Sequence, residues 1–234
     1  MKHPKTARCT VNDMSVFKVA EKFVSINGEG PRAGELAVFL RFCGCNLNCG
    51  YCDTRWANTA DVKYDLVSAE DLVAYVRSTG VKNVTLTGGE PLLQADIAQL
   101  IELLGESGAQ VEIETNGSVP LKNIVSLAPR PSVTADYKLP SSGMEKFMLP
   151  ENFSYLTLQD AVKFVVGDER DLVRADDIIN RYGLIGKCRV YFSPVFGKIN
   201  PEEITEFMKE RKLNGVRLQL QLHKIIWKPD MRGV

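Results

Sequence analysis

The stretch Cys45-Asn46-Leu47-Asn48-Cys49-Gly50-Tyr51-Cys52 holds three cysteines in the pattern C-x3-C-x2-C, with an aromatic residue before the last of them. It follows the apolar segment Leu36–Phe42, which is typical of a strand, so we expect the cysteines to lie in a loop at the end of that strand. A disulfide framework spreads its cysteines along a small secreted chain, whereas three of the six cysteines here fall in one short run. The run therefore predicts metal or redox chemistry.

The composition narrows the class of protein. The first residues lead into no apolar segment of the kind that a secretory signal needs, and no run of about 18 apolar residues is present. We therefore expect a cytoplasmic protein with reduced thiols and no membrane partner. The 234 residues carry 29 basic and 29 acidic side chains, so no net charge attracts nucleic acid and no nucleic-acid partner is expected.

Three thiolates in one loop can hold three irons of a 4Fe–4S cluster and leave the fourth iron open. An open metal position can bind a substrate or cofactor, as it does in catalytic zinc sites. The alternative is a zinc site, which needs a fourth ligand. The two histidines, His3 and His223, are both distant in sequence, and Cys43 would give an uncommon zinc spacing. The cysteines Cys45, Cys49 and Cys52 are therefore predicted to hold an iron–sulfur cluster.

Short apolar runs alternate with helical patterns along the chain. Strands are expected at 36–42, 83–87, 110–114, 132–135, 161–166, 189–192 and 216–222. Helices are expected at 68–78, 96–104, 172–181 and 201–211. This alternation predicts an α/β fold with a parallel sheet, specifically an incomplete TIM-like barrel of about six core strands. The Val16–Ser25 segment is expected to add a strand or flap beside it.

The unusual residues of the chain come directly after the predicted strands. They are the cysteines, Gly88-Gly89-Glu90-Pro91, Glu114-Thr115-Asn116-Gly117, Lys138, Ser193-Pro194 and His223. In barrel-like α/β folds the carboxyl ends of the strands converge on one face, where the chemistry takes place. We therefore expect one site at that face.

The cysteine pattern, together with a strand that ends in Gly88-Gly89-Glu90-Pro91, resembles the radical S-adenosylmethionine (SAM) superfamily. The resemblance implies the radical SAM fold, a 4Fe–4S cluster and SAM. In that superfamily the open iron chelates SAM, and one electron cleaves it to methionine and a 5′-deoxyadenosyl radical. Without the cysteines, the Gly-Gly-Glu-Pro segment would be interpreted as an ordinary turn.

A narrower resemblance rests on Phe23–Gly30, Arg41, Asp53-Thr54 and Gln221-Leu222-His223-Lys224. These segments are similar to the 7-carboxy-7-deazaguanine synthase family of queuosine and 7-deazapurine biosynthesis. The resemblance implies Mg²⁺-dependent ring contraction of 6-carboxy-5,6,7,8-tetrahydropterin to 7-carboxy-7-deazaguanine, with release of ammonia. It also implies a homodimer and an electron donor such as flavodoxin or ferredoxin. The family usually has Gln where this chain has Asn27.

The resemblance implies a role for each matching residue. Thr54 would bind Mg²⁺, a hard ion that prefers oxygen ligands, although a Thr that ends a loop by a local hydrogen bond is the alternative. The residues expected to bind SAM are Tyr51, Cys52, Asp53, Gly88, Gly89, Glu90, Glu114, Asn116, Asp136, Tyr137, Lys138, Ser193, Pro194, Val195 and Phe196. The residues expected to bind the substrate are Ile26, Asn27, Gly28, Glu29, Arg41, Thr87, His223 and Val234.

These assignments divide one domain, residues 1–234, into three parts. Residues 15–35 would form a substrate-site segment, 36–223 the partial barrel, and 224–234 a tail that closes on the site, with a frayed terminus as the alternative. In the implied mechanism the radical abstracts hydrogen from C6 of the pterin, Mg²⁺ supports ring contraction, and hydrogen returns before ammonia leaves. The protein would position the reactants and exclude water.

Two rival functions share some of these features. An activating enzyme of the same superfamily, which makes a glycyl radical on a partner protein, would keep the cysteines and Gly88–Pro91 without needing Arg41 or Thr54. A non-enzymatic zinc module would use the cysteines alone. Outside the cysteine loop, Cys9 and Cys188 are expected to be small buried hydrophobes, and Phe164, Tyr191 and Phe192 to belong to the core.

Overall fold

A computed structural model of the chain describes residues 15–234, in which nine strands form one sheet in the order β3-β1-β2-β4-β5-β6-β7-β8-β9. The strands are β1 (Val16–Ile26), β2 (Leu36–Phe42), β3 (Asp65–Ser68), β4 (Asn83–Gly88), β5 (Gln110–Thr115), β6 (Ser132–Tyr137), β7 (Ala161–Val166), β8 (Arg189–Pro194) and β9 (Val216–Leu218). The α-helices are α1 (Ala69–Thr79), α2 (Ile97–Glu106), α3 (Lys122–Val125), α4 (Glu169–Tyr182), α5 (Pro201–Glu210) and α6 (Leu222–Ile226). Short 3-10 helices are η1 (Arg55–Asn58), η2 (Pro91–Leu93), η3 (Pro140–Ser142), η4 (Glu145–Phe147) and η5 (Pro150–Tyr155).

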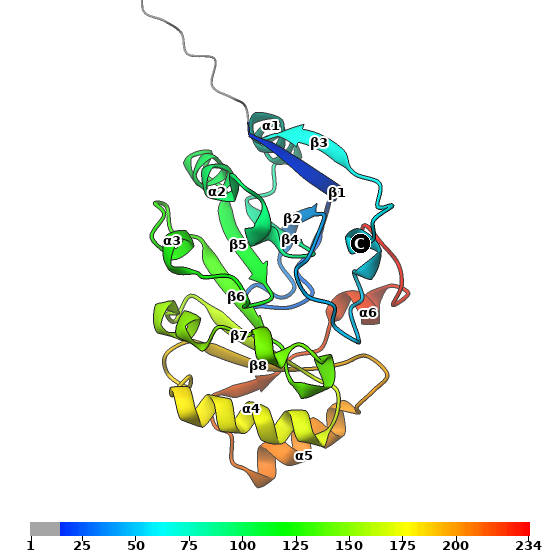
Figure 1. Cartoon of the computed structure of the whole chain (residues 1–234), viewed down its shortest axis with the longest axis vertical. Coiled ribbons are helices and arrows are strands. Elements are labelled where there is room, and N and C mark those ends of the chain that lie inside the picture. The colour runs from blue at the N-terminus through cyan, green and yellow to red at the C-terminus, as the bar shows by residue number, and fades with distance from the viewer. Residues whose placement is uncertain (1–14) are drawn as a thin grey trace, which may run out of the picture.

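The sheet is a partial barrel. Strands β2 and β4 to β9 run parallel to their neighbours, whereas β1 lies antiparallel between β2 and β3. Because β3 and β9 are the two ends of the strand order, the sheet stays open. The helices α1, α2, α4 and α5 lie around the outside of the curved sheet (Figure 1). The predicted incomplete barrel is therefore confirmed, and the Val16–Ser25 segment is a strand.

Local signals in the sequence explain where the helices begin and end. The Ser68 hydroxyl accepts a hydrogen bond from the Asp71 amide at 3.1 Å, and α1 ends at Gly80 with φ at 70°. Helix α5 begins with a capping box between Asn200 and Glu203, around Pro201 at the first turn.

Predicted and observed boundaries differ at the end of the last strand and at the end of α2, and one strand was not predicted. The last strand ends at Leu218 rather than at residue 222, so His223 lies in α6 and does not directly follow a strand. The chain leaves the sheet there because the Leu222 amide bonds the Gly28 carbonyl at 3.1 Å. Helix α2 continues through Gly105, where a Cβ would lie 2.9 Å from the Pro129 ring. The short strand β3 was not predicted at all.

The two faces of the sheet differ in chemistry. The outer face carries apolar residues that are fully buried beneath the helices, among them Val84, Leu86, Ile113, Phe164 and Phe192. The inner face carries polar residues at the alternate positions, namely Thr85, Thr87, Glu112, Glu114, Thr134, Asp136, Lys163 and Ser193. The hydrophobic core therefore lies between sheet and helices, and the inner face is left to line a polar chamber.

The predicted core residues are buried. Phe164, Tyr191 and Phe192 all lie in the core, as do Cys43 and Cys188. Cys9 and His3 lie outside the described residues.

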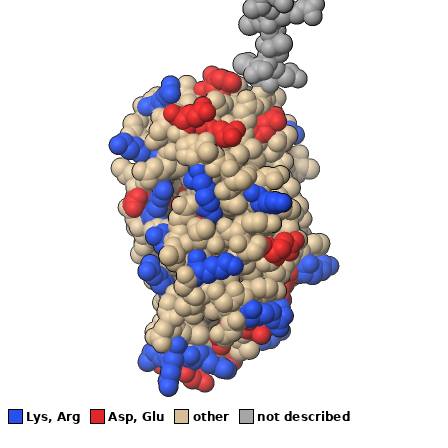
Figure 2. Space-filling view, turned by 90° about the vertical axis from the view of Figure 1, so that its left-hand side faces the viewer, with Lys and Arg blue, Asp and Glu red and all other residues tan. Residues whose placement is uncertain are grey.

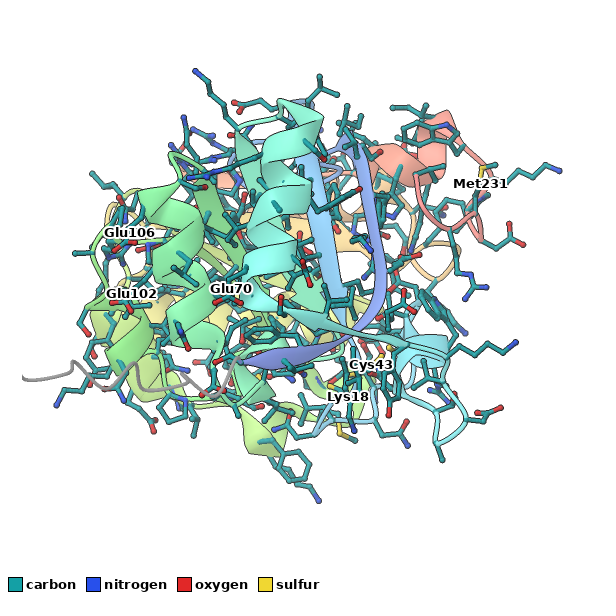
Figure 3. All side chains as sticks on the ribbon, turned by 90° about the horizontal axis from the view of Figure 1, so that it is seen from above. Lys18, Cys43, Glu70, Glu102, Glu106 and Met231 are labelled. Atoms are coloured by element: carbon teal, nitrogen blue, oxygen red, sulfur yellow. The ribbon has the colours of Figure 1, made fainter. Side chains whose placement is uncertain are left out.

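Seen from above, Cys43 lies near Lys18, whereas Glu102 and Glu106 lie on the opposite side of the molecule from Met231 (Figure 3). Over residues 15–234, no helix has the length and apolar composition needed to cross a membrane.

Candidate active site

The cysteine loop joins the end of β2 to η1. Cys49 is buried, while Cys45 and Cys52 are half-buried. Burial raises the pKa of the Cys45 and Cys49 thiols, and the nearby Lys138 ammonium opposes the shift in the pKa of Cys49. The Cys45 sulfur also accepts long contacts from the Leu47 amide at 3.4 Å and the Asn116 amide group at 3.6 Å.

These thiols fit an iron–sulfur cluster better than a zinc ion. Over residues 15–234, no three His, Cys, Asp or Glu side chains lie close enough to hold one metal ion. A zinc ion needs its ligands around a single centre, whereas a 4Fe–4S cluster takes each thiolate on a different iron. The donor set, three sulfurs in one loop without a nearby imidazole, is the soft set that iron–sulfur clusters use.

Two glycines join the end of β4 to the cysteine loop. A Cβ on Gly88 would lie 2.2 Å from the Phe42 carbonyl oxygen, and one on Gly89 would lie 2.0 Å from the Gly44 carbonyl oxygen. The backbone is close because the Gly89 amide bonds Phe42 at 3.1 Å and the Glu90 amide bonds Gly44 at 2.8 Å. In the described structure the glycines thus permit contact within the protein, between the two segments that frame the site.

Glu90 is fully buried and ties the same region to β5. Its carboxylate accepts hydrogen bonds from the Leu92 amide at 3.1 Å, the Thr115 hydroxyl at 2.9 Å and the Asn116 amide at 2.7 Å. Burial raises the pKa of Glu90 to about 7, although these three donors oppose the rise. Both oxygens are therefore engaged by the protein, and a direct contact of Glu90 with SAM stays a prediction.

A network of charges lies inside the chamber. The Lys163 ammonium on β7 lies 3.3 Å from Glu29 and 3.8 Å from Asp136, and Lys138 lies 2.7 Å from Asp136. Burial by itself would raise the pKa of Glu29, but Lys163 and hydrogen bonds from Gln221 and Ser193 bring it below its usual value. Burial likewise opposes the charge of Lys163, yet Glu29 and Asp136 raise the pKa of Lys163 above its usual value. Glu29 and Lys163 therefore stay ionised inside the fold.

The floor of the chamber is the loop Asn27–Gly30 between β1 and β2. The Thr85 hydroxyl donates to Asn27 at 2.8 Å, and Glu29 accepts from Ser193 at 2.8 Å and from Gln221 at 3.0 Å. Gly30 exchanges two hydrogen bonds with the Gln219 side chain, at 2.8 and 3.0 Å. The loop thereby closes the gap that the open sheet leaves between β2 and β9.

Several polar atoms of the site have no partner. Over the described residues, the buried side-chain atoms without a hydrogen bond are Ser25 Oγ, Asn27 Nδ2, Asn58 Oδ1, Glu112 Oε2 and Asp136 Oδ1. Buried polar groups are nearly always paired in folded proteins. Because Asn27, Glu112 and Asp136 belong to the floor and inner wall, their unpaired atoms indicate that the chamber binds a polar ligand.

Most predicted substrate residues lie together around this floor. His223 contacts Gly28, at which a Cβ would lie 2.4 Å from His223 Nδ1, and burial lowers the pKa of His223. Arg41 is adjacent to Thr87 in the β2–β4 register, and Thr87 donates to Glu114 at 3.0 Å. Ile26 ends β1 directly before the floor loop. No hydrogen bond or ion pair joins Val234 to the chamber within the described part of the chain.

The predicted SAM residues divide into two groups. Asp136, Lys138 and Ser193 face the chamber, and Asp53 at its rim is paired with Lys224 at 3.0 Å. Tyr137, by contrast, lies on the outer face, with its ring 5.7 Å from that of Phe164. Because β6 alternates its side chains between the two faces, only the Tyr137 backbone lies at the chamber, and its contact with SAM stays a prediction.

Five further predicted residues, four for SAM and Thr54 for Mg²⁺, complete this comparison. The Tyr51 hydroxyl lies 3.4 Å from the Val165 carbonyl oxygen, and Thr54 lies between the cluster loop and β4, 3.7 Å from Cys52 Sγ and 3.4 Å from the Gly88 carbonyl oxygen. Pro194 ends β8 and Val195 after it is buried, whereas Phe196 is exposed at the rim.

The sequence reasoning missed Lys163, Glu112, Thr134 and Gln219, and it assigned no role to Gln221, which it noted only as part of the family resemblance. The signal for the first three is a polar residue at every second position of the inner strands, which places Glu112 beside Glu114 and Thr134 beside Asp136 on one face. Lys163 lies in the apolar run Ala161–Val166, where its charge is the only departure from a core strand.

Comparisons with known proteins agree with this geometry. The radical SAM superfamily pattern matches residues 40–211. The 7-carboxy-7-deazaguanine synthase of Clostridium acetobutylicum is 58% identical over 219 residues, covering 93% of this chain and 99% of that protein. The same enzyme of Chlorobaculum tepidum is 37% identical over 222 residues, with 93% and 97% covered. The crystal structure of QueE from Escherichia coli matches with a TM-score of 0.71 at 26% identity, covering 88% of this chain and 94% of that one.

The chain is therefore a radical SAM enzyme, whose cofactors are a 4Fe–4S cluster and SAM. Within that superfamily it belongs to the 7-carboxy-7-deazaguanine synthase family, a family of lyases. This membership excludes the zinc module and favours a small-molecule reaction over the activation of a partner protein.

Proposed function

We propose that the chamber binds 6-carboxy-5,6,7,8-tetrahydropterin, and that the chain converts it to 7-carboxy-7-deazaguanine with release of ammonia. The observation that carries the proposal is two unpaired buried atoms on the floor and inner wall, where Asn27 Nδ2 offers a donor and Glu112 Oε2 offers an acceptor. A reduced pterin carries both donors and acceptors along one edge, and so can satisfy them.

The carboxylate of Glu29 is suited to the guanidine-like edge of the pterin. It is ionised and held in place by Lys163, Ser193 and Gln221. Two carboxylate oxygens offer about four acceptor positions, of which these donors use three. One acceptor position remains for the substrate.

Arg41 is suited to the carboxylate of the substrate. Its Nε donates to Glu21 at 2.7 Å, which fixes the plane of the guanidinium. The two terminal nitrogens then form a fork of the shape that a carboxylate accepts. Thr87 and His223 would complete the wall around the pterin.

When bound, the cluster and SAM supply the radical that starts the reaction by removing a hydrogen atom from the substrate. Cys45, Cys49 and Cys52 would hold the cluster. Lys138 and Asp136 lie beside Cys49, where their charges would orient the polar end of SAM. The floor loop and α6 would hold the pterin and exclude water.

The proposal is tested by anaerobic incubation with SAM, a strong reductant and 6-carboxytetrahydropterin, with and without Mg²⁺. We expect 7-carboxy-7-deazaguanine and ammonia in equal amounts. SAM cleavage without a pterin product would contradict the proposal and favour the activating-enzyme reaction.

Thr54 is proposed to bind Mg²⁺ through its hydroxyl. We predict that Thr54→Ala weakens the response of turnover to Mg²⁺ about tenfold, because Mg²⁺ prefers oxygen ligands, and leaves SAM cleavage intact. The measurement is a Mg²⁺ titration of product formation. Thr59→Ala is the control, since the Thr59 hydroxyl bonds only the nearby Trp56 carbonyl. An unchanged titration for Thr54→Ala would contradict the assignment.

Other expectations from the sequence stay predictions. They are a homodimer, a flavodoxin or ferredoxin electron donor, a cytoplasmic location, and a tail over residues 224–234 that closes on the site. Sedimentation of the reconstituted enzyme tests the first of these.

A further inference from the structure

A cavity of about 450 Å³ lies at the opposite end of the barrel from the cysteine loop. Its walls come from the segments that precede β2, β5, β6, β7 and β8, at the amino ends of these strands. Residues on its wall include Arg32, Glu35, Gln110, Arg130, Ser132 and Arg189. None of them belongs to the proposed active site, whose residues lie at the carboxyl ends and inside the chamber.

The three arginines of the cavity differ in how the protein engages them. Both terminal nitrogens of Arg130 are fully used within the protein, since they donate to Asp160 at 3.0 and 2.7 Å and to the Pro131 and Tyr155 carbonyls at 3.0 and 3.3 Å. Arg32 uses one nitrogen for Asn83 at 2.8 Å and the Gln110 carbonyl at 3.3 Å, and its other nitrogens bond no described residue. Arg189 is half-buried and forms no side-chain hydrogen bond or ion pair with residues 15–234.

No carboxylate of the described residues forms an ion pair with Arg32 or Arg189. Glu35, which also lines the cavity, accepts a hydrogen bond from the neutral Asn83 amide group at 3.0 Å, and Asp160 is engaged by Arg130. The guanidinium groups of Arg32 and Arg189 are thus partly buried without an ion-pair partner. Burying a charge without a partner is unfavourable, so an anionic ligand would be stabilised there.

The surroundings add positive charge. Basic residues on adjoining segments at the same ends of the strands are Lys82, Lys187, Arg211, Lys212 and Arg217. On the side shown in Figure 2, Asp and Glu gather near the top, whereas Lys and Arg are more numerous below.

The cavity also has an apolar wall. Val111, Pro129 and Pro131 line it beside the arginines. A wall of this kind suits a flat ring, while Gln110 and Ser132 offer polar contacts beside it. The volume lies in the range of sites for small molecules and is too small to enclose a segment of a macromolecule.

We propose that this cavity binds a phosphorylated small molecule of nucleotide size, with its phosphates on Arg32 and Arg189 and its ring against Pro129 and Pro131. Planar guanidinium groups match phosphate oxygens with paired N–H donors, and Arg32 and Arg189 are the cavity arginines whose donors are not all used within the protein. The proposal does not depend on the proposed function, since the two sites share no residue.

The test is equilibrium dialysis of radiolabelled ATP against the full-length protein, reconstituted with its cluster and saturated with SAM. Saturating SAM fills the adenosine-binding part of the active site. We expect one ATP to bind per chain. The affinity for ATP should fall about tenfold in Arg189→Gln. It should fall further in the double variant that carries both Arg32→Gln and Arg189→Gln. Arg217→Gln is the control, because Arg217 is exposed at the same end but does not line the cavity.

Several outcomes would overturn the proposal. One such outcome is that neither ATP nor pyrophosphate binds at millimolar concentrations. Another is that citrate binds as tightly as ATP, and a third is that added SAM displaces ATP. Tighter binding of a single-stranded oligonucleotide that the arginine variants abolish would instead indicate a nucleic-acid surface. The cluster absorbance and SAM affinity of each variant must match the original protein, which shows that it is folded.

Discussion

At the scale of single residues, Gly89 leaves no room for a side chain. A Cβ there would lie 2.0 Å from the Gly44 carbonyl oxygen and 2.2 Å from Asn58 Oδ1. We predict that Gly89→Ala displaces the cysteine loop, lowers stability by about 1–3 kcal/mol and reduces iron content after anaerobic reconstitution. Iron and sulfide analysis measures this loss.

The matched control for this substitution is Gly50→Ala in the same loop. A Cβ on Gly50 would lie 3.7 Å from the Ser141 carbonyl oxygen, which is an ordinary contact. We expect this variant to retain its cluster. If Gly89→Ala and Gly50→Ala hold equal amounts of iron, the close approach at Gly89 does not position the loop.

Glu112 makes stability depend on pH. Burial raises its pKa to about 7 from 4.5, although the Thr134 hydroxyl donates to one of its oxygens. The folded state therefore favours the protonated form. The stability that this gives is fully present below about pH 4.5 and is lost as the pH rises through 7. The difference between the two pKa values corresponds to about 3 kcal/mol in the free energy of unfolding.

We predict that Glu112→Gln, which cannot ionise, loses less stability than the original protein between pH 5 and pH 8. Urea unfolding under anaerobic conditions at the two pH values measures how much stability each protein loses. Glu90, whose pKa is also raised, contributes equally in both proteins and so does not affect the comparison. Glu106→Gln, at an exposed position, should behave as the original does. Parallel pH dependences for Glu112→Gln and the original would contradict the shift.

At the scale of elements, Asp171 on α4 holds the segment that covers the cysteine loop. Its carboxylate accepts hydrogen bonds from the Ser141 amide at 3.0 Å, the Gly167 amide at 2.8 Å and the Ser141 hydroxyl. The neighbouring Ser142 carbonyl in turn accepts the Gly50 amide at 3.0 Å. Helix α4 therefore positions the loop through one buried carboxylate.

We predict that Asp171→Asn costs about 2 kcal/mol, because an amide nitrogen then faces donors, and speeds the loss of the cluster in air. The decay of cluster absorbance measures this rate. Asp176→Asn is the control on the same helix, where Asp176 only accepts a hydrogen bond from Asn180. Equal decay of both variants would show that α4 does not support the loop.

The elements also show what a sequence can predict. Strands β4 to β8 were predicted because their outer residues, such as Leu86 and Phe164, form apolar runs between turn signals. The end of β9 was not predicted correctly, because the chain leaves the sheet where Gln219 and Gln221 bond Gly30 and Glu29, about 190 positions away in sequence. A pattern of neighbouring residues carries no information about such a distant contact. Lys163 was missed for the same reason, since its partner Glu29 lies in a distant segment.

At the scale of the whole molecule, the C-terminal tail lies against the cluster side. The Arg232 guanidinium lies 4.2 Å from the centre of the Trp56 ring, and the C-terminus is drawn beside η1 (Figure 1). If the tail closes on the substrate, Arg232→Ala should raise the KM for the pterin about two- to fivefold. SAM affinity should not change.

Steady-state kinetics with varied pterin measures this effect. Arg232→Lys should be less affected, because an ammonium retains part of the attraction to the ring. Arg211→Ala removes a similar contact, with Phe207 at 5.5 Å on α5, and serves as the control. A KM unchanged in Arg232→Ala would contradict the closing role of the tail.

The floor loop has a consequence for biosynthesis. Its amides and carboxylate are secured by Gln219 and Gln221, which leave the ribosome long after the sheet around them has been made. A nascent chain that stops at β9 would have every parallel strand and all three cluster cysteines, but its floor loop would lack the contacts with Gln219 and Gln221. Such long-range contacts form late in folding. Full pterin affinity should therefore be acquired only after residues 219–221 have been made, whereas the ability to assemble the cluster arises earlier.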